Sequence, residues 1–101
     1  MKYRFSIEAE EELDVAYADC EAYRQGMGTE FQSAITKAID LLLQFPHLGG
    51  REDNTKIRRF LIAGYPYSLI YKVQPEFIDI IALPHHKQRP GYWKKRLKRQ
   101  A

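Results

Sequence analysis

The sequence predicts one α+β domain in which an N-terminal helical hairpin packs on one face of a small, mostly antiparallel sheet. Three observations support this prediction. A short alternating stretch opens the chain, two stretches with helical periodicity follow it, and three strand-like stretches separated by tight turns occupy the second half. The expected order is β-α-α-β-β-β, followed by a short basic C-terminal helix or tail. A chain of 101 residues suffices for one modest core and not for two, so we expect residues 1–101 to form a single domain.

The first strand and the hairpin are expected before residue 46. Residues 1–7, "MKYRFSI", alternate apolar and polar side chains, which is typical of a half-buried strand. Ser6 is a suitable N-cap for the first helix, whose glutamate-rich first turns are expected to be solvated surface. The second helix is expected to begin at Thr29, which forms a capping-box pair with Gln32, and to end at Pro46. The predicted apolar stripe of the first helix is Ala9, Leu13, Ala16, Tyr17, Cys20 and Tyr23.

The other three strands are expected in close succession. Their predicted ranges are 56–62, 67–73 and 77–83. The connections "AGYP" and "QPE" between them suit hairpins, and residues 47–55 are predicted to form a polar connection from the second helix. Pro84 ends the last strand, and residues 92–99 are predicted to form the final short helix.

Charge divides the chain into two unlike halves. Residues 1–50 carry four Lys or Arg and nine Asp or Glu, whereas residues 51–101 carry twelve and four, so the net charges are −5 and +8. A basic half of this kind is typical of a surface that meets phosphates or an acidic protein. Cys20, the single cysteine, falls on the apolar stripe and is predicted to be a buried, inert thiol. The sequence has no secretory signal, no membrane-spanning run and no cofactor or metal motif, which favours a cytoplasmic protein.

Three blocks of residues carry a resemblance to a known family. They are Arg59–Leu61 ("RFL"), Tyr65–Tyr71 ("YPYSLIY") and Arg89–Trp93 ("RPGYW"), and they follow the strand and the hairpin in order. Over residues 3–96 the chain resembles the RelE/ParE superfamily, small bacterial toxins of type II toxin–antitoxin systems. The resemblance implies a cognate antitoxin whose acidic segment covers part of the toxin. It also implies one of two activities on one fold, which the fold alone does not decide.

The first activity is that of RelE-like members, which cut mRNA on the ribosome without a metal ion. This chemistry needs a general base, a general acid and cations around the phosphorane. The catalytic candidates are His85, His86 and Arg89, and the candidates for holding phosphate or nucleic acid are Lys56, Arg58, Arg59, Lys87 and Arg89.

Other interpretations of these residues stay open. The two histidines are also typical of a solvated chain end, and Arg58 or Arg59 is also a candidate for a structural ion pair with Asp79 or Glu76. RelE-like members usually carry a phosphate-contacting arginine at the position of Ser68, which has neither charge nor fork geometry. This departure weakens the ribonuclease interpretation.

The second activity is that of ParE-like members, which block DNA gyrase and are not known for catalysis. The stretch "GYPYSLIY", followed by a tail with Arg89, Pro90, Tyr92, Trp93 and Arg96, resembles this class more closely. Its activity needs an exposed cationic and aromatic surface that meets an acidic protein face or gyrase-bound DNA. The target-binding candidates are Tyr92, Trp93, Lys95 and Arg96. An equally open alternative is that Trp93 packs the tail on the core. Gyrase inhibition is therefore the preferred prediction, with the ribonuclease and a diverged, non-toxic binding module as the alternatives.

Overall fold

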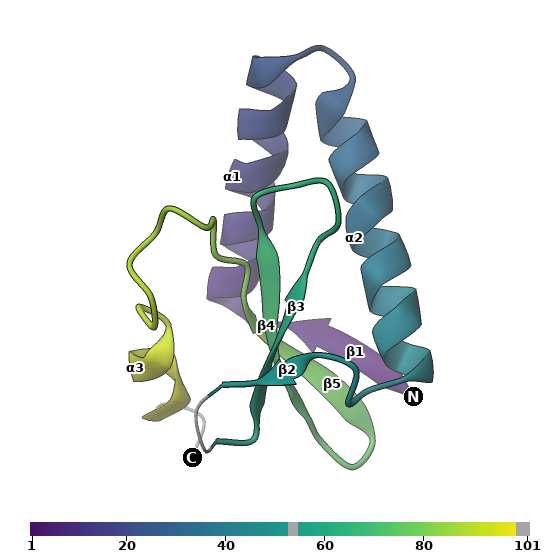
Figure 1. Ribbon diagram of the computed structural model, residues 1–101, viewed down its shortest axis with the longest axis vertical. Coiled ribbons are helices and arrows are strands. Elements are labelled where there is room, and N and C mark those ends of the chain that lie inside the picture. The colour runs from purple at the N-terminus through teal and green to yellow at the C-terminus, as the bar shows by residue number, and fades with distance from the viewer. Residues whose placement is uncertain (53–54, 99–101) are drawn as a thin grey trace.

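The protein has the predicted α+β architecture in a computed structural model that describes residues 1–52 and 55–98. The elements follow in the order β1 (Lys2–Phe5), α1 (Ile7–Tyr23), α2 (Met27–Gln44), β2 (Gly50–Arg51), β3 (Ile57–Leu61), β4 (Ser68–Val73), β5 (Phe77–Ala82) and α3 (Lys94–Leu97). The five strands form one sheet in the order β1-β5-β4-β3-β2. Strand β1 runs parallel to β5, and the other neighbours are antiparallel, as Figure 1 shows.

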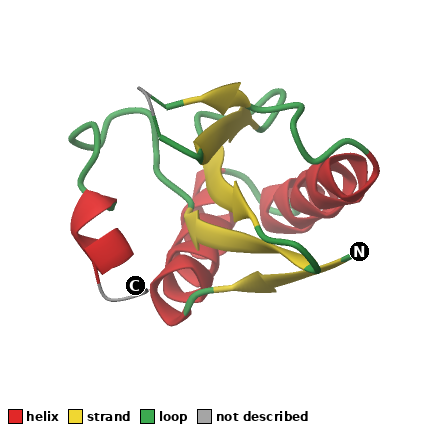
Figure 2. Cartoon of the chain, turned by 90° about the horizontal axis from the view of Figure 1, so that it is seen from below, coloured by secondary structure: helices red, strands yellow, loops and turns green. Residues whose placement is uncertain are grey.

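Helices α1 and α2 form the expected hairpin and cover one face of the sheet (Figures 1 and 2). The Ser6 hydroxyl accepts a hydrogen bond from the Ala9 backbone N–H at 3.1 Å, which confirms the predicted N-cap of α1. Cys20 is 5% exposed within the core beneath the hairpin, which confirms its predicted burial. The main residues of this core are Ala16, Phe31, Ile35, Leu42, Leu69, Tyr71, Ile78 and Ile80.

The start of α2 differs from the prediction. The helix begins at Met27, after Gly26 has turned the chain with a φ of 88°, a left-handed conformation that favours glycine. The Glu21 carboxylate accepts from the backbone N–H groups of Gly26 and Gly28 at 3.0–3.1 Å. It therefore supplies the acceptor that the first N–H groups of α2 need. The Thr29 capping box was therefore the wrong prediction, because a carboxylate near the end of the preceding helix accepts from the first N–H groups.

The end of the predicted apolar stripe on α1 is also wrong. Tyr23 is 83% exposed and Tyr17 is exposed as well. The helical hairpin extends beyond the end of the sheet in Figure 1, so the last turn of α1 has no strand beneath it. Helical periodicity identifies a face, but it does not show how far the opposing sheet reaches.

The second face of the sheet is covered by the C-terminal tail, by which we mean residues 84–98. Figure 2 shows α3 and α2 on opposite sides of the sheet. A second apolar cluster lies between tail and sheet: Ile57, Ile70, Ile81, Ala82 and Trp93, with Tyr92 and Leu97 packed against it. The helix in the tail is shorter than the predicted 92–99, and Arg99 lies outside the described residues.

The connection 47–55 contains a strand that the sequence pattern did not predict. Strand β2 pairs with β3 through Gly50 opposite Arg59 and Arg51 opposite Arg58. The buried hydroxyl of Tyr71 donates to the Pro46 carbonyl at 2.8 Å and accepts from the Gly49 N–H at 2.9 Å. These two bonds hold the connection against the sheet, and no local alternation signals them.

No helix within residues 1–52 and 55–98 is long and apolar enough to span a membrane.

Candidate functional site

The tail begins as an extension of the sheet. The Pro84 carbonyl accepts from the Ser68 N–H at 3.2 Å, and the His86 N–H donates to the Pro66 carbonyl at 2.8 Å. The chain then turns at Gly91, where a φ of 74° is of the kind that glycine adopts readily. These contacts direct the tail back across the sheet towards α1.

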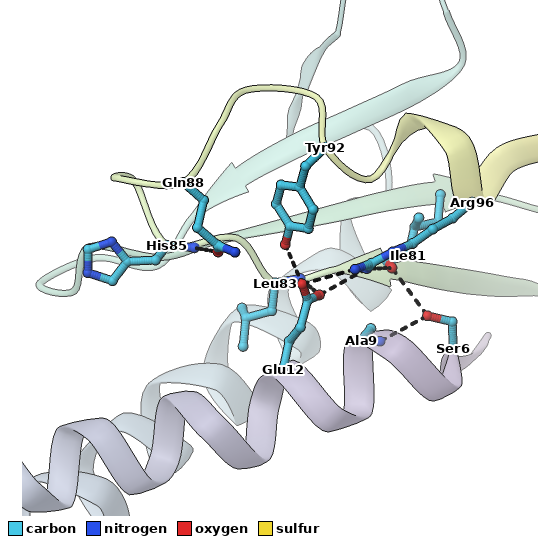
Figure 3. A network of polar contacts seen from close by, with 9 residues as sticks. All are labelled: Ser6, Ala9, Glu12, Ile81, Leu83, His85, Gln88, Tyr92 and Arg96. Carbon is cyan, nitrogen blue, oxygen red and sulfur yellow. Dashed lines mark hydrogen bonds and ion pairs between the residues drawn. The ribbon is translucent and has the colours of Figure 1, made fainter.

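A three-residue group, which we call the Glu12 clasp, fixes the far part of the tail to α1. It consists of Glu12, Tyr92 and Arg96 (Figure 3). The Arg96 guanidinium donates to both carboxylate oxygens of Glu12, with Nη1–Oε1 at 3.0 Å and Nη2–Oε2 at 3.1 Å. The Tyr92 hydroxyl also donates to Glu12. This fork geometry is the strongest form of arginine–carboxylate contact.

Backbone groups complete the Glu12 clasp. The Leu83 N–H donates to Glu12 Oε1 at 3.1 Å, and Arg96 Nη1 donates to the Ile81 carbonyl at 3.1 Å. The side chains of Arg96 and Glu12 are only 12% and 19% exposed. The clasp therefore joins α1, the end of β5 and the tail in one network, which Figure 3 shows from close by. Glu12 had been expected as solvated surface, and that prediction was wrong.

The clasp shifts the pKa of its titratable groups. Burial acts to raise the pKa of Glu12, but hydrogen bonds from Arg96, Tyr92 and the Leu83 N–H outweigh it and hold the pKa below the usual value. The Tyr92 pKa is raised well above its ordinary range, first by burial and then by its hydrogen bond to the Glu12 carboxylate. Both shifts keep the clasp in its charged, hydrogen-bonded form near neutral pH.

Three of the four predicted target-binding residues contact the protein itself. Trp93 is 1% exposed and fills the cluster between tail and sheet, while Tyr92 and Arg96 belong to the Glu12 clasp. Lys95 is exposed. The structure therefore places Trp93 in the packing role that the sequence left open. The tail also carries a set of exposed cations that we call the outer basic surface: Lys87, Arg89, Lys94, Lys95 and Lys98.

The histidine end of the tail borders a cavity of about 250 Å³, which we call the tail hollow. Its lining residues are Arg59, Pro84, His85, His86, Gln88, Arg89, Pro90, Gly91, Tyr92 and Trp93. His86 Nε2 lies 3.1 Å from the hydroxyl of the buried Ser68, which fixes the imidazole at the cavity wall. His85 packs edge-on against Tyr67, with ring centroids 5.0 Å apart. The hollow thus brings together all three catalytic candidates, His85, His86 and Arg89, and adds Arg59 from the phosphate-binding set.

The other predicted phosphate-binding residues do not join this group. Arg58 points to the opposite face of β3, where its Nη1 donates to the carbonyls of Gly49 at 2.7 Å and His47 at 3.1 Å. Lys56 is exposed, one residue before β3, and Lys87 does not line the hollow. Strand alternation separates Arg58 from Arg59, as the sequence indicated.

Arg59 forms an ion pair, as the sequence predicted for Arg58 or Arg59, but its partner is neither Asp79 nor Glu76. Arg59 Nε lies 2.7 Å from Glu52 Oε1, a residue that follows the unpredicted strand β2. Asp79, one of the two predicted partners, instead lies 3.4 Å from Arg4 Nε across the β1–β5 pair. The predicted pairing was wrong because β2 and the parallel edge strand β1 supply closer groups.

A larger cavity of about 480 Å³ lies on the other side of the Glu12 clasp, between α1 and the tail. Its rim carries Glu8, Glu11, Glu12 and Asp19, and its walls include Val15, Tyr67 and Leu83. The cationic tail hollow and this acidic cavity therefore flank the same clasp. Within residues 1–52 and 55–98 no His, Cys, Asp and Glu side chains are grouped in a way that suits a metal ion.

Comparisons with known proteins agree with this fold. A family model described as "ParE toxin of type II toxin-antitoxin system, parDE" matches residues 3–90. A solved chain from the "Chromosomal ParDE TA system from P. aeruginosa" superposes with a TM-score of 0.72, covering 84% of this chain and 95% of that chain at 18% sequence identity. At this identity the likeness concerns the fold. The curated proteins contain no match to the sequence.

Proposed function

The chain belongs to the ParE family of toxins of type II toxin–antitoxin systems, and we propose that it inhibits DNA gyrase in the cytoplasm and is neutralised by a cognate antitoxin. The observation that carries the proposal is the outer basic surface, five exposed cations on a tail that is folded against the sheet. Such a surface complements an acidic protein face or the DNA that gyrase holds.

The folded state of the tail supports this mechanism. A flexible basic tail would lose conformational freedom on binding, whereas a tail held by the Glu12 clasp and by Trp93 is already ordered. We propose that Lys95 and its exposed neighbours contact the target. Tyr92, Trp93 and Arg96 would then contribute as positioning residues, because their side chains are used within the protein.

An acidic antitoxin segment is proposed to cover the basic half of the toxin. Opposite charges speed the encounter of two proteins and are screened by salt, so antitoxin binding is expected to weaken as ionic strength rises. The acidic cavity between α1 and the tail is a poor site for that segment, because Glu8, Glu11 and Asp19 would repel it. The outer basic surface is the better candidate.

Metal-independent ribonuclease activity remains the second candidate, on one specific observation. His86, Arg59 and Arg89 line one cavity, as a general acid or base and two phosphate-binding cations would. Three features weigh against it: Ser68 stands at the position of the family arginine, Arg58 is bonded to backbone carbonyls, and Lys56 lies outside the hollow. We therefore rank gyrase inhibition first.

The test is ATP-dependent supercoiling by purified gyrase in the presence of the chain, beside cleavage of mRNA on ribosomes. We expect loss of supercoiling and intact mRNA. The double variant Lys87→Glu, Lys95→Glu should abolish the inhibition, while Lys37→Glu on α2, outside the tail, should leave it unchanged. Cleaved mRNA that disappears with His86→Ala would establish the ribonuclease instead. Normal growth with soluble, antitoxin-free protein would favour the non-toxic binding module.

A further inference from the structure

The cations of the tail hollow come from two segments far apart in the sequence. Arg59 projects from β3, and His86 and Arg89 come from the tail. Ile57, two residues before Arg59, packs beside Trp93, so strand alternation places Arg59 on the face that the tail covers. None of the described residues that line the hollow is acidic. The cavity is therefore a concave, positively charged surface built by tertiary folding.

The donors around the hollow are not fully used within the protein. The ion pair of Arg59 with Glu52 engages Nε, and its two terminal nitrogens have no acceptor among the described residues. The exposed Arg89 side chain likewise has no hydrogen-bond partner in the described part of the chain. His86 is held at the wall by its contact with Ser68. The hollow thus offers two guanidinium forks and a fixed imidazole, the groups that best match an oxyanion.

Trp93 supplies an independent observation on the same cavity. It lines the hollow, and its buried Nε1–H has no hydrogen-bond acceptor within residues 1–52 and 55–98. A buried donor without a partner is unfavourable, so native proteins usually provide an acceptor. None of the described residues around the hollow supplies that acceptor. An oxyanion in the hollow would supply acceptor oxygens, directly or through a bridging water.

We propose that the tail hollow is a binding site for a phosphate group, held by Arg59, Arg89 and His86 beside Trp93. Gyrase inhibition and antitoxin binding do not require this site, and a phosphate can bind there whether or not the chain cleaves RNA. A bound phosphate bridges β3 and the tail, so it also stabilises the tail against the sheet. The volume of about 250 Å³ exceeds that of phosphate alone and leaves room for the group that carries it.

The single tryptophan provides the measurement. The indole N–H gives one signal in an ¹H–¹⁵N spectrum, and we expect inorganic phosphate to shift it saturably, whereas chloride at equal ionic strength does not. Arg89→Gln, a change of an exposed side chain, should weaken binding roughly tenfold because it removes a charged hydrogen-bonding partner. Lys37→Gln, at an exposed position on α2 outside the hollow, also removes one positive charge; it is the control and should bind as the unchanged chain does.

Two results would overturn the proposal. One is a shift that chloride reproduces, which would be general screening. The other is a phosphate response that survives both Arg89→Gln and Arg59→Gln in variants whose spectra show the native fold. Because the measurement uses the isolated chain and no gyrase, its failure leaves the proposed toxicity intact.

Further ligands distinguish the sources of the phosphate. Tighter binding of a single-stranded dinucleotide than of inorganic phosphate would assign the site to a nucleic-acid backbone, and equal binding would assign it to the free anion; either supports the phosphate site. An acidic peptide that shifts the indole signal while both phosphates fail would instead make the hollow a carboxylate site, which contradicts the proposal.

Discussion

Glu12 on α1 and Arg96 on α3, 84 residues apart in the sequence, form a two-bonded ion pair that holds the C-terminal tail to the N-terminal helix. Both side chains are largely shielded from solvent, and the Tyr92 hydroxyl and the Leu83 N–H add two further donors to the same carboxylate. The tail of this toxin is therefore a folded part of the domain. Its function is expected to depend on contacts inside the protein as well as on the charges that it exposes.

Glu12→Gln tests how much this ion pair contributes to the free energy of unfolding. The amide keeps the size of the side chain but removes the charge, which leaves the shielded Arg96 guanidinium without its counter-ion. Breaking a fully buried pair costs about 3–5 kcal/mol, and partial exposure reduces this to about 2 kcal/mol. Urea unfolding should show this loss in the free energy of unfolding. Glu11→Gln, an exposed neighbour on α1, is the control, and equal losses in the two variants would contradict the structural role of Glu12.

The same carboxylate predicts a dependence of stability on pH. The Glu12 pKa is lower in the folded protein than its ordinary value of 4.5, so the folded state favours the charged form. The resulting stability is fully present above the ordinary pKa and is lost as pH falls below it, through the lowered pKa of the folded protein. Free energies of unfolding measured at pH 7 and pH 3 should therefore differ less for Glu12→Gln than for the unchanged chain. Parallel losses in both proteins would show that other carboxylates dominate acid unfolding.

Local sequence patterns predicted the elements that depend on local physics. The Ser6 cap, the position of strand β1 and the apolar runs of β4 and β5 each follow from the spacing of a few neighbouring residues. The half-burial predicted for β1 was wrong, because Tyr3 is 48% exposed on this edge strand. The features that were missed depend on distant partners. Glu21 caps α2 in place of Thr29, and nothing in the spacing of α2 itself points to it.

The candidate site shows the same division. The basic and aromatic character of the tail was visible in the sequence, but the sequence did not show which of its side chains face the protein interior. Trp93 and Arg96 look like interface residues until Ile57 and Glu12 are known to lie opposite them. An apolar face on β3 and β5 that no helix of the hairpin covers was the available signal, because such a face must be buried by something. Arg59 and His86 likewise share a cavity only after β3 and the tail have packed together.

Trp93→Ala is expected to release the tail from the second face of the sheet. Removing a fully buried tryptophan costs about 3–5 kcal/mol, and Trp93 is the largest buried side chain of the apolar cluster on the tail side. Thermal unfolding followed by circular dichroism should show a large fall in the midpoint temperature. Tyr23→Ala, at an 83% exposed position, should change stability by less than about 0.5 kcal/mol. If the proposed mechanism holds, Trp93→Phe, which retains an apolar ring, should recover both the fold and part of the inhibition of gyrase.

Tyr92→Phe separates a positioning role from direct contact with a target. The change removes the hydroxyl that donates to Glu12 and keeps the ring, over which the Arg96 guanidinium lies at 5.1 Å. We expect a loss of about 1–2 kcal/mol in the free energy of unfolding, as for a hydrogen bond to a charged group. In the background of Glu12→Gln the same change should cost much less, because its partner carboxylate is already gone. A double-mutant cycle on stability, repeated with supercoiling inhibition as the readout, measures this coupling. Coupling in both readouts would identify Tyr92 as a residue that acts through the clasp, whereas an additive effect on inhibition alone would mean that its hydroxyl meets the target.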